Sequence, residues 1–306
     1  MFDILVAGEI NPDLILSGNV TPEFGQVEQL VDSAALTVGS SSAIFACGAA
    51  RLGLKVAFIG VCGDDVFGRF MLEEFQARGV NISNVILLPN GQTGLSVILS
   101  RGVDRAILTH SGLITALKAG DVTDSLLQQT HHLHVASYFL QTALQSGLPG
   151  LFVRARSIGL TTSLDTNWDP SAEWREFDEL LRLTNIFLPN ENEASALSGA
   201  STAEAALQIL SRKSQVVVVK CGRSGALARQ GNITTSAPAL PMQVVDTIGA
   251  GDTFDAGFIY GWLNGWGLEK SLMLAVACGS LSTRAVGGIS AQPTLEEAMK
   301  YVQSIG

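Results

Sequence analysis

Charged residues are scarce in this chain, and basic residues are scarcer than acidic ones. Of its 306 residues only 15% are charged, and 19 Lys and Arg face 28 Asp and Glu, which gives a formal net charge of −9. The sequence has no dense Lys/Arg run, and an acidic chain repels polyphosphate backbones, so nucleic-acid binding is disfavoured. Any anionic substrate must be held by local donors, because no general positive field would attract it.

Long apolar runs and paired cysteines are missing as well. No apolar stretch approaches the roughly 20 residues of a membrane-spanning helix, and Met1 to Asp3 place no basic segment before an apolar run, as a secretory signal would. The cysteines are scattered without CxxC spacing, so we expect free thiols in a reducing compartment, and a disulfide or zinc site is disfavoured. These absences predict a cytoplasmic protein with no membrane partner. The cysteines are Cys47, Cys62, Cys221 and Cys278.

The chain also has no Pro/Ser-rich linker and no internal repeat, which favours a single domain over residues 1–306. Short apolar runs alternate with segments of helical spacing. Runs that are apolar on both faces are typical of buried parallel strands, so the pattern predicts a doubly wound α/β fold with ligands at the carboxyl ends of the strands. The expected strands are 4–7, 56–60, 134–136, 161–164, 186–188 and 216–219, and the expected helices are 41–52, 65–78, 173–182, 202–212, 251–263 and 268–285.

Two stretches break this alternation. Residues 13–38 and 91–109 carry alternating segments, such as Leu95 to Ser100, with no helix to follow. We interpret them as a small β-structured lid that projects from the main sheet. Irregular surface loops are the alternative.

The stretch from Asp246 to Phe254 combines a glycine turn with an acidic residue. A Gly-Ala-Gly turn that opens a helix lets the amides of Gly249, Ala250 and Gly251 approach a phosphate, and the helix N-terminus adds partial positive charge. In the same turn Asp252 would accept the proton of an attacking hydroxyl, and the helix field should hold it ionised. The alternative is that this aspartate only caps the helix.

This stretch resembles the second signature of the PfkB family of carbohydrate kinases. Residues 39–53 are similar to the first signature of the family, 60–68 to its G-x-x-G-x-D-x-x-G element, 190–193 to its N-x-x-E element, and 220–226 to its nucleotide-side glycine turn. The resemblance covers nearly the whole chain in the family's order. It implies a ribokinase-like three-layer α/β/α sandwich with a β lid, and transfer of phosphate from ATP to a hydroxyl of a sugar-like substrate.

The resemblance also implies roles for the matched residues. Asp252 would be the catalytic base and the turn amides an anion hole for the transferring phosphoryl group. Glu193, helped by Asn190, would arrange Mg²⁺ and its waters, although by pattern alone this pair is typical of a helix cap. Asp246 would lie beside a monovalent cation such as K⁺, as in several relatives. The nucleotide side would include Lys220, Gly222, Gly225 and Asn190.

On the substrate side, Asp13 matches the acidic residue with which the family holds sugar hydroxyls. A carboxylate that accepts two O–H bonds fixes a polyol, whereas the alternative is an ordinary turn after Pro12. Gly39 would let the substrate approach the backbone closely. The chain departs from the family's pattern at the next positions, where Ser40 replaces a glycine and Ile44 replaces an asparagine. The lost polar side chain would shift the preference away from ribose and simple nucleosides.

Residues 165–174 resemble the D-x-N-x-R…W element of fructokinase and ketodeoxygluconate-kinase relatives, which favours fructose or a ketodeoxygluconate-like acid as substrate. Asn167 stands at the asparagine position of this element, but Asp169 occupies the arginine position, so a cation expected near the phosphates is absent. Arg105 and Lys220 are the remaining candidates, and each could instead be a solvated surface charge.

Two rival functions stay open. A nucleoside kinase on the same fold would use Ile44 and Phe45 as a shelf for the base. A catalytically silent, metabolite-binding protein is the other, favoured by the departures at Ser40, Ile44 and Asp169 and disfavoured by the intact glycine turn. Because relatives often pair through their lids, the lid edges also suggest a homodimer.

Overall fold

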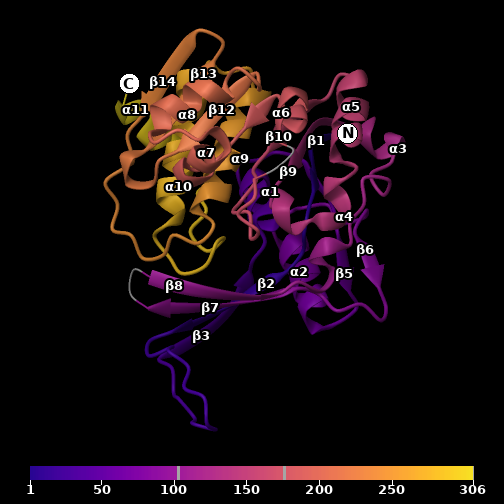
Figure 1. Ribbon diagram of the computed structural model, residues 1–306, viewed down its shortest axis with the longest axis vertical. Helices are drawn as coiled ribbons and strands as arrows, with labels where there is room; N and C mark the ends of the chain where they lie inside the picture. Colours follow the sequence, from indigo (N-terminus) through magenta and orange to yellow (C-terminus); the bar gives the residue numbers. More distant parts are fainter. Residues whose placement is uncertain (102–103, 175–176, 306) are drawn as a thin grey trace.

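An eight-stranded sheet runs through the larger body of the molecule (Figure 1). The computed structural model describes residues 1–101, 104–174 and 177–305. Six neighbouring strands of this sheet, β4, β1, β9, β10, β11 and β12, pair in parallel. Strands β13 and β14 then extend the sheet beyond β12 in antiparallel fashion. In spatial order the strands are β14 (Ile233–Ala237), β13 (Ala226–Gln230), β12 (Val216–Lys220), β11 (Ile186–Phe187), β10 (Thr161–Leu164), β9 (Thr130–Val135), β1 (Phe2–Ala7) and β4 (Val56–Ile59).

Both faces of this sheet are buried. Along β1 the side chains alternate between two apolar cores, with Ile4 and Val6 in one and Leu5 and Ala7 in the other. This arrangement confirms the predicted three-layer α/β/α architecture. One core is covered by α1 (Ser41–Arg51), α2 (Val66–Ala77), α9 (Ala250–Leu263), α10 (Leu268–Ser282) and α11 (Leu295–Ile305), and the other by α3 (Asp124–Leu127), α4 (Thr142–Gln145), α5 (Leu148–Ser157), α6 (Asp178–Leu183), α7 (Glu191–Ser198) and α8 (Ala203–Leu210).

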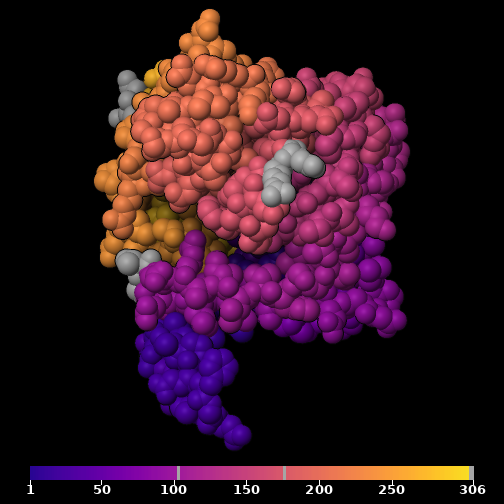
Figure 2. Space-filling model, viewed as in Figure 1, coloured from indigo at the N-terminus to yellow at the C-terminus, as the bar shows by residue number. Residues whose placement is uncertain are grey.

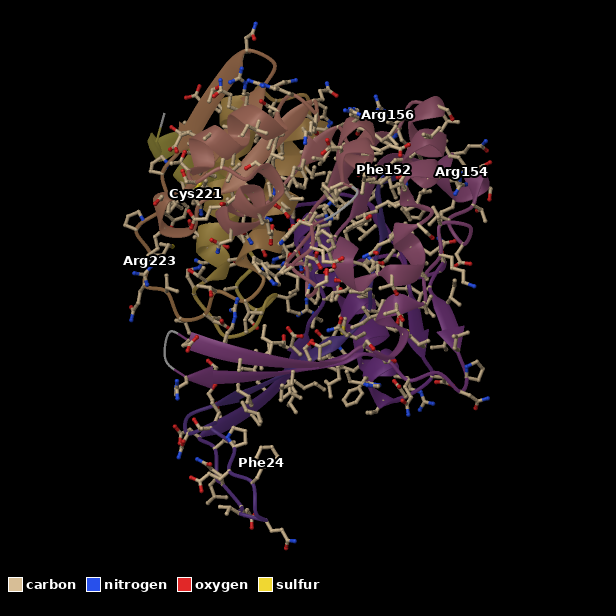
Figure 3. The ribbon with its side chains drawn as sticks, viewed as in Figure 1. Phe24, Phe152, Arg154, Arg156, Cys221 and Arg223 are labelled. Carbon is tan, nitrogen blue, oxygen red and sulfur yellow. The ribbon has the colours of Figure 1, made fainter. Side chains whose placement is uncertain are left out.

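The two stretches that break the alternation form a separate four-stranded sheet, so the predicted β lid is confirmed. Its order is β3 (Ser33–Val38), β2 (Pro12–Ser17), β7 (Leu95–Arg101) and β8 (Asp104–His110), with β2 and β7 parallel and the outer pairs antiparallel. The connection from β2 to β3, residues 18–32, projects away from the body (Figure 2). Figure 3 shows Phe24 on this projection, where the side chain is fully exposed.

A smaller two-stranded sheet, β5 (Val61–Gly63) and β6 (Ile86–Leu88), leads from the body into α2. The Asp65 carboxylate caps α2 by accepting the amide of Gly68 at 2.8 Å, and it also accepts the amide of Thr93 at 2.8 Å. The aspartate of the G-x-x-G-x-D-x-x-G element therefore ties the start of a helix to the segment that enters the lid.

The expected strands of the body all form, as do five of the six expected helices, but the helix predicted over 173–182 is wrong in its first half. The structure begins α6 at Asp178. Before it, the Asp169 carboxylate accepts the amides of Glu173 and Trp174 at 3.0 and 2.9 Å, and Trp174 has a positive φ of 49°. These bonds close a turn that a helix could not contain. Residues 175–176 of the predicted helix lie outside the described residues.

The four cysteines are free and buried, as expected. Across the described part of the chain, no helix has both the length and the apolar character that crossing a bilayer requires.

Candidate active site

A cavity of about 650 Å³ lies between the lid and the carboxyl ends of the body strands. Figure 2 shows the surface hollowed where the lid meets the body. We call this the acceptor cavity. A second cavity of about 710 Å³, here the nucleotide cavity, lies beside it over α9 and α10. The two cavities meet, because four residues line both of them: Lys220, Gly222, Thr247 and Gly251.

The glycine turn lies at this meeting point. Gly249 has φ +70°, and a Cβ there would lie 2.7 Å from Cα of Gly288 and 2.9 Å from the Ile44 side chain, so only glycine fits. Ala250 begins α9, and its amide donates to the carbonyl of Thr247 at 3.3 Å. That leaves the amides of Gly249 and Gly251 as the better donors for an anion, because the first N–H groups of a helix have no partner within it.

Asp252 lies in the first turn of α9 and lines the acceptor cavity. Burial raises the pKa of its carboxyl to about 8, the nearby Asp165 adds to the rise, and Lys220 and a hydrogen bond from Ser41 oppose it. The expectation that the helix field holds Asp252 ionised is therefore wrong at neutral pH, because burial outweighs that field. A carboxyl with a raised pKa is a stronger base once it loses its proton.

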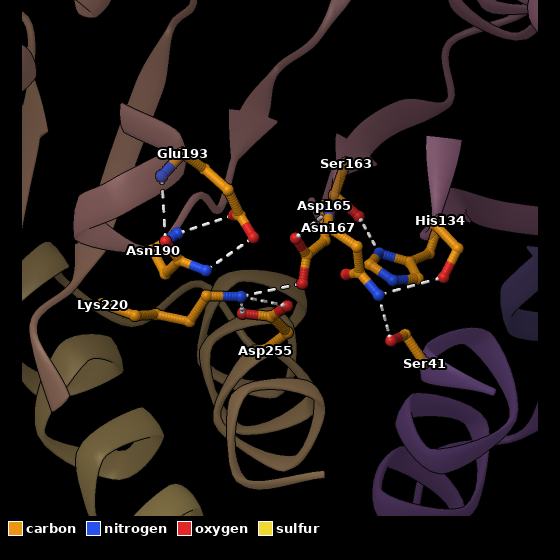
Figure 4. A network of polar contacts seen from close by, with 10 residues as sticks. Ser41, His134, Ser163, Asp165, Asn167, Asn190, Glu193, Lys220 and Asp255 are labelled. Atoms are coloured by element: carbon orange, nitrogen blue, oxygen red, sulfur yellow. Dashed lines mark hydrogen bonds and ion pairs between the residues drawn. The ribbon is translucent and has the colours of Figure 1, made fainter. Parts of the chain in front are cut away.

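Lys220 reaches from the end of β12 into a cluster of carboxyl groups (Figure 4). Its Nζ lies 2.8 Å from Oδ2 of Asp165 and 3.0 Å from Oδ2 of Asp255. Burial alone would lower the pKa of Lys220, but the two carboxyl groups raise it above its usual value. The interpretation of Lys220 as a solvated surface charge is wrong, since its side chain is only 12% exposed.

Asn190 and Glu193 form a complete capping box at the start of α7. The Asn190 side chain accepts the amides of Asn192 and Glu193 at 2.9 Å, and the Glu193 carboxylate accepts the amide of Asn190 at 2.9 Å. Burial raises the pKa of Glu193 to about 7, with Asp165 adding to the rise. Both residues also line the acceptor cavity, so the cap and a functional position coincide.

This pair fits Mg²⁺, because both side chains offer the oxygen atoms that the ion prefers. Both carboxylate oxygens of Glu193 already accept bonds within the cap. Contact through bound waters would leave the cap intact, in keeping with the hydration that Mg²⁺ retains. The carboxyl groups of Asp165, Asp252 and Asp255 also lie close enough together to hold a metal ion. The Lys220 ammonium already pairs with two of them, Asp165 and Asp255.

Asp13 enters the acceptor cavity from β2 of the lid. Burial raises the pKa of this carboxyl to about 7, and Arg105 acts in the opposite direction. A Cβ on Gly39 would lie 2.1 Å from Oδ1 of Asp13. Gly39 therefore makes room for the Asp13 carboxyl, which fills the space where a side chain would lie. The expected approach of the substrate to the backbone at Gly39 stays a prediction.

Ser40 and Asn167 both have positive φ, 64° and 53°. The Ser40 hydroxyl caps α1 by accepting the amide of Ala43 at 3.0 Å, and it donates to the carbonyl of Glu9 at 2.7 Å. The Asn167 amide donates to the hydroxyl of Ser41 at 2.5 Å. Both residues line the acceptor cavity, and the bonds that they make offset their backbone strain.

Arg105 reaches the same cavity from β8, where its guanidinium donates to the Thr247 hydroxyl at 3.3 Å. It thereby links the lid to the segment before the glycine turn. Asp246, in that segment, accepts the amides of Ile248 and Gly287 at 3.0 and 2.9 Å. Its role beside a monovalent cation stays a prediction.

The nucleotide cavity is mainly apolar, and glycines form one edge of it. Gly225 has φ +90°, and a Cβ there would lie 2.0 Å from the carbonyl oxygen of Ala237. Gly222 has φ +52°, and Figure 3 shows the neighbouring Arg223 on the outer side of this turn. The apolar lining comes from Ala239, Leu240, Pro241, Met242, Val244, Phe254 and Val276.

Residues 1–295 match the family described as "pfkB family carbohydrate kinase". The chain belongs to this family. It is therefore an ATP-dependent sugar kinase, a phosphotransferase with an alcohol group as acceptor.

Curated relatives span nearly the whole kinase at modest identity. It is 26% identical to the ribokinase of Haemophilus influenzae, with 98% of each chain covered. It is 27% identical to the 2-dehydro-3-deoxygluconokinase of Bacillus subtilis, with 92% and 91% covered. Among solved structures, that of Arabidopsis thaliana ribokinase with ribose and ATP has a TM-score of 0.84 at 24% identity, with 99% of each chain covered. An E. coli structure described as a Ribokinase II, with ATP and Mg²⁺, has a TM-score of 0.86 at 25% identity, covering 99% of this kinase and 100% of that chain.

The structure brings most of the predicted site residues of the kinase together, and it adds others. Glu9, Ser41 and Asp255 carry polar groups at the site that the motifs did not point to. Asp255 could have been found, because it follows Asp252 by three residues and so shares its helix face. For Ser41 and Glu9 the sequence offers no such signal.

One rival function loses its support at Phe45. This side chain is completely buried and stacks on His134, with ring centroids 3.6 Å apart. The predicted shelf for a nucleoside base at Phe45 is therefore wrong, although Ile44 does line the acceptor cavity.

Proposed function

We propose that this kinase transfers the γ-phosphoryl group of ATP to a hydroxyl of a sugar or sugar acid, with Asp252 as the general base. One observation carries the proposal: Asp252 lines the acceptor cavity, and the preceding Gly251 of the glycine turn lines both cavities. A hydroxyl in one cavity and a phosphate chain in the other would face each other there.

In the transfer, the acceptor oxygen forms a bond to the γ-phosphorus as the bond from that phosphorus to the bridging oxygen of ADP breaks. The Asp252 carboxylate takes the hydroxyl proton, and the amides of Gly249 and Gly251 donate to the phosphoryl oxygens. Mg²⁺, held through water by Glu193 and Asn190, would neutralise charge on the phosphates. The lid above the cavity would exclude water as a competing acceptor.

We favour a deoxy sugar acid over ribose as the substrate class. Arg105 offers the acceptor cavity a fork that suits a carboxylate, and Asp13 offers an acceptor for hydroxyl groups. Ile44 provides no hydrogen bond where the family's pattern has asparagine, so a carbon without a hydroxyl would fit beside it. Several of the curated relatives, from Geobacillus, Clostridium and Bacillus, are named for deoxygluconate substrates. Fructose is the neutral alternative.

A substrate panel tests this proposal. Purified kinase with ATP and Mg²⁺ is offered 2-dehydro-3-deoxygluconate, 5-dehydro-2-deoxygluconate, fructose, ribose and adenosine, and ADP release is measured. We expect the highest kcat/KM with a deoxy sugar acid. Preference for adenosine would point to the nucleoside kinase, and binding without ADP release from any compound would point to the silent, metabolite-binding protein.

Assembly and monovalent-cation dependence are further parts of the proposal. Leu36 and Leu108 are exposed apolar side chains on the outer lid strands, and they support a homodimer that forms through the lid. Sedimentation velocity should show a dimer that Leu108→Asp dissociates. The Asp246 carboxylate orders the loop around it by accepting the amides of Ile248 and Gly287, which supports a K⁺ site there. Replacing K⁺ by Na⁺ should then lower turnover.

A further inference from the structure

One charged side chain lies at the junction of the two cavities, where the proposed phosphoryl transfer would take place. Of the four described residues that line both cavities, Gly222, Thr247 and Gly251 are uncharged, and Lys220 carries an ammonium group. The position that the D-x-N-x-R element assigns to a cation is held by Asp169. The carboxylate of that residue is turned to the amides of its own turn.

The place of the Lys220 ammonium is set by two buried partners. Nζ lies 2.8 Å from Asp165 Oδ2, and 3.2 and 3.0 Å from the two oxygens of Asp255. The side chains of Asp165 and Asp255 are 3% and 1% exposed. A lysine side chain is flexible and normally loses much entropy when held in one place, so two fixed partners on rigid elements are needed to define its position.

The ammonium also lies against the backbone of the glycine turn. A Cβ built on Gly251 would be 3.5 Å from Nζ of Lys220. Asp255 comes one helical turn after the base Asp252 on α9, so one helix presents both the proton acceptor and the group that holds the lysine. Burial raises the pKa of Asp255 well above its usual range. Asp165 and a protonated Asp255 would carry one negative charge, which the ammonium balances.

We infer that Asp255 is a positioning residue, which holds the Lys220 ammonium at the junction of the two cavities, where it stabilises the charge of the transferring phosphoryl group. Lys220 thereby supplies, from the end of β12, the cation that is missing at Asp169. A point charge already fixed at this place costs no reorganisation during the reaction, which is what makes such stabilisation effective. The inference rests on the proposed phosphoryl transfer beside Asp252.

The test separates hydrogen bonding from bulk at Asp255. Asp255→Leu removes the bond to Lys220, whereas Asp255→Asn keeps a carbonyl for Nζ and an amide for Asp165. We expect Asp255→Leu to lower kcat about 100-fold, with the KM of the acceptor changed less than about threefold, as for an interaction made mainly in the transition state. Asp255→Asn should stay within about fivefold of the wild-type kcat, because both hydrogen bonds can form.

A double-mutant cycle shows whether Asp255 acts through the lysine. In a Lys220→Met background, Asp255→Leu should lower kcat by less than about twofold, because the group that it positions is gone. If Asp255→Leu costs as much there as in the wild type, the inference is overturned. If Asp255→Leu does not fold, Asp255→Ser, which is too short to reach Nζ, takes its place in the cycle.

Nucleotide affinity provides a readout that needs no acceptor. The ratio of the Kd of ADP to that of ATP, both with Mg²⁺, reports contacts to the γ-phosphate. We expect Lys220→Met and Asp255→Leu each to lower this ratio about tenfold, the loss of one charge-assisted contact. An unchanged ratio in both variants would rule out a Lys220 contact with the γ-phosphate.

Two controls complete the experiment. Lys213 and Asp178 form an ion pair at 2.6 Å that lines neither cavity, and Lys213→Met with Asp178→Leu should leave both kcat and the ratio unchanged. Asp252→Asn should lose turnover and keep the wild-type ratio. Failure of the proposed base would therefore be distinguishable from failure of the inference, since the affinity ratios are measured without turnover.

Discussion

Two strands that reach the acceptor cavity, β12 of the body and β8 at the edge of the lid, differ in burial. In the body, Val216–Val219 of β12 are completely buried, and the strand ends at Lys220 in the site. In the lid, every residue of β8 is exposed, and the strand carries Arg105. Groups held by a packed core keep their positions and can act on reacting atoms, whereas groups on an exposed strand can adjust to a ligand. The difference predicts that the body sets turnover and the lid sets substrate preference.

The largest effect should come from the body, at Asp252. Asp252→Asn keeps the shape of the side chain but cannot accept the proton, so we expect kcat to fall about 10³- to 10⁴-fold, at the upper end for general bases. Nucleotide affinity, measured by isothermal titration calorimetry, should change little. Near-normal turnover of this variant would remove Asp252 from the role of base.

The next largest effect should come from the glycine turn. Gly249→Ala would force a Cβ against Gly288 at φ +70°, so we expect about 1–3 kcal/mol of lost stability and at least a tenfold loss of kcat. Gly79→Ala is the matched control, because Gly79 has φ +78° and open space around its Cβ position. Thermal unfolding and kcat are measured for both. Equal kcat in the two variants would show that the turn has no special place in transfer.

The pH dependence sharpens the same comparison. Burial raises the pKa of Asp252 to about 8, and the base must be deprotonated, so kcat should rise with pH and level off above about pH 8. Lys220 opposes this rise in pKa, so Lys220→Met should move the profile to higher pH. The measurement is kcat from pH 6 to 10 at saturating substrates. A profile flat down to pH 6 would contradict the raised pKa in the working enzyme.

The smallest effect should come from the lid. Arg105→Met should raise the KM of a sugar acid about tenfold by removing a charge-assisted contact, and leave kcat nearly unchanged. The KM of a neutral sugar should not move. Arg101→Met is the control, since Arg101 lies on β7 of the lid and lines neither cavity. A fall in kcat with an unchanged KM would break the proposed division between body and lid.

The motifs predicted the residues of the turn and the cap, because these depend on neighbours in sequence. The glycine turn and Asp252 lie within nine consecutive residues, and Asn190 and Glu193 within one helical turn. Contacts between distant segments were not predictable in the same way. Nothing near Gly39 in the sequence reveals that the Asp13 carboxyl fills the space beside it. The turn closed by Asp169 was likewise mistaken for part of a helix.

The sequence by itself determined the alternation of strands and helices, the family and the position of the glycine turn with the proposed base, because apolar periodicity and a backbone that only glycine can adopt are local properties. Only the tertiary structure decided the charge of the site. It brought Lys220, Asp165 and Asp255 within hydrogen-bonding distance from three separate elements, and it buried Asp252 deeply enough to raise its pKa. Ion pairs and desolvation depend on distances through space, which the order of residues does not record.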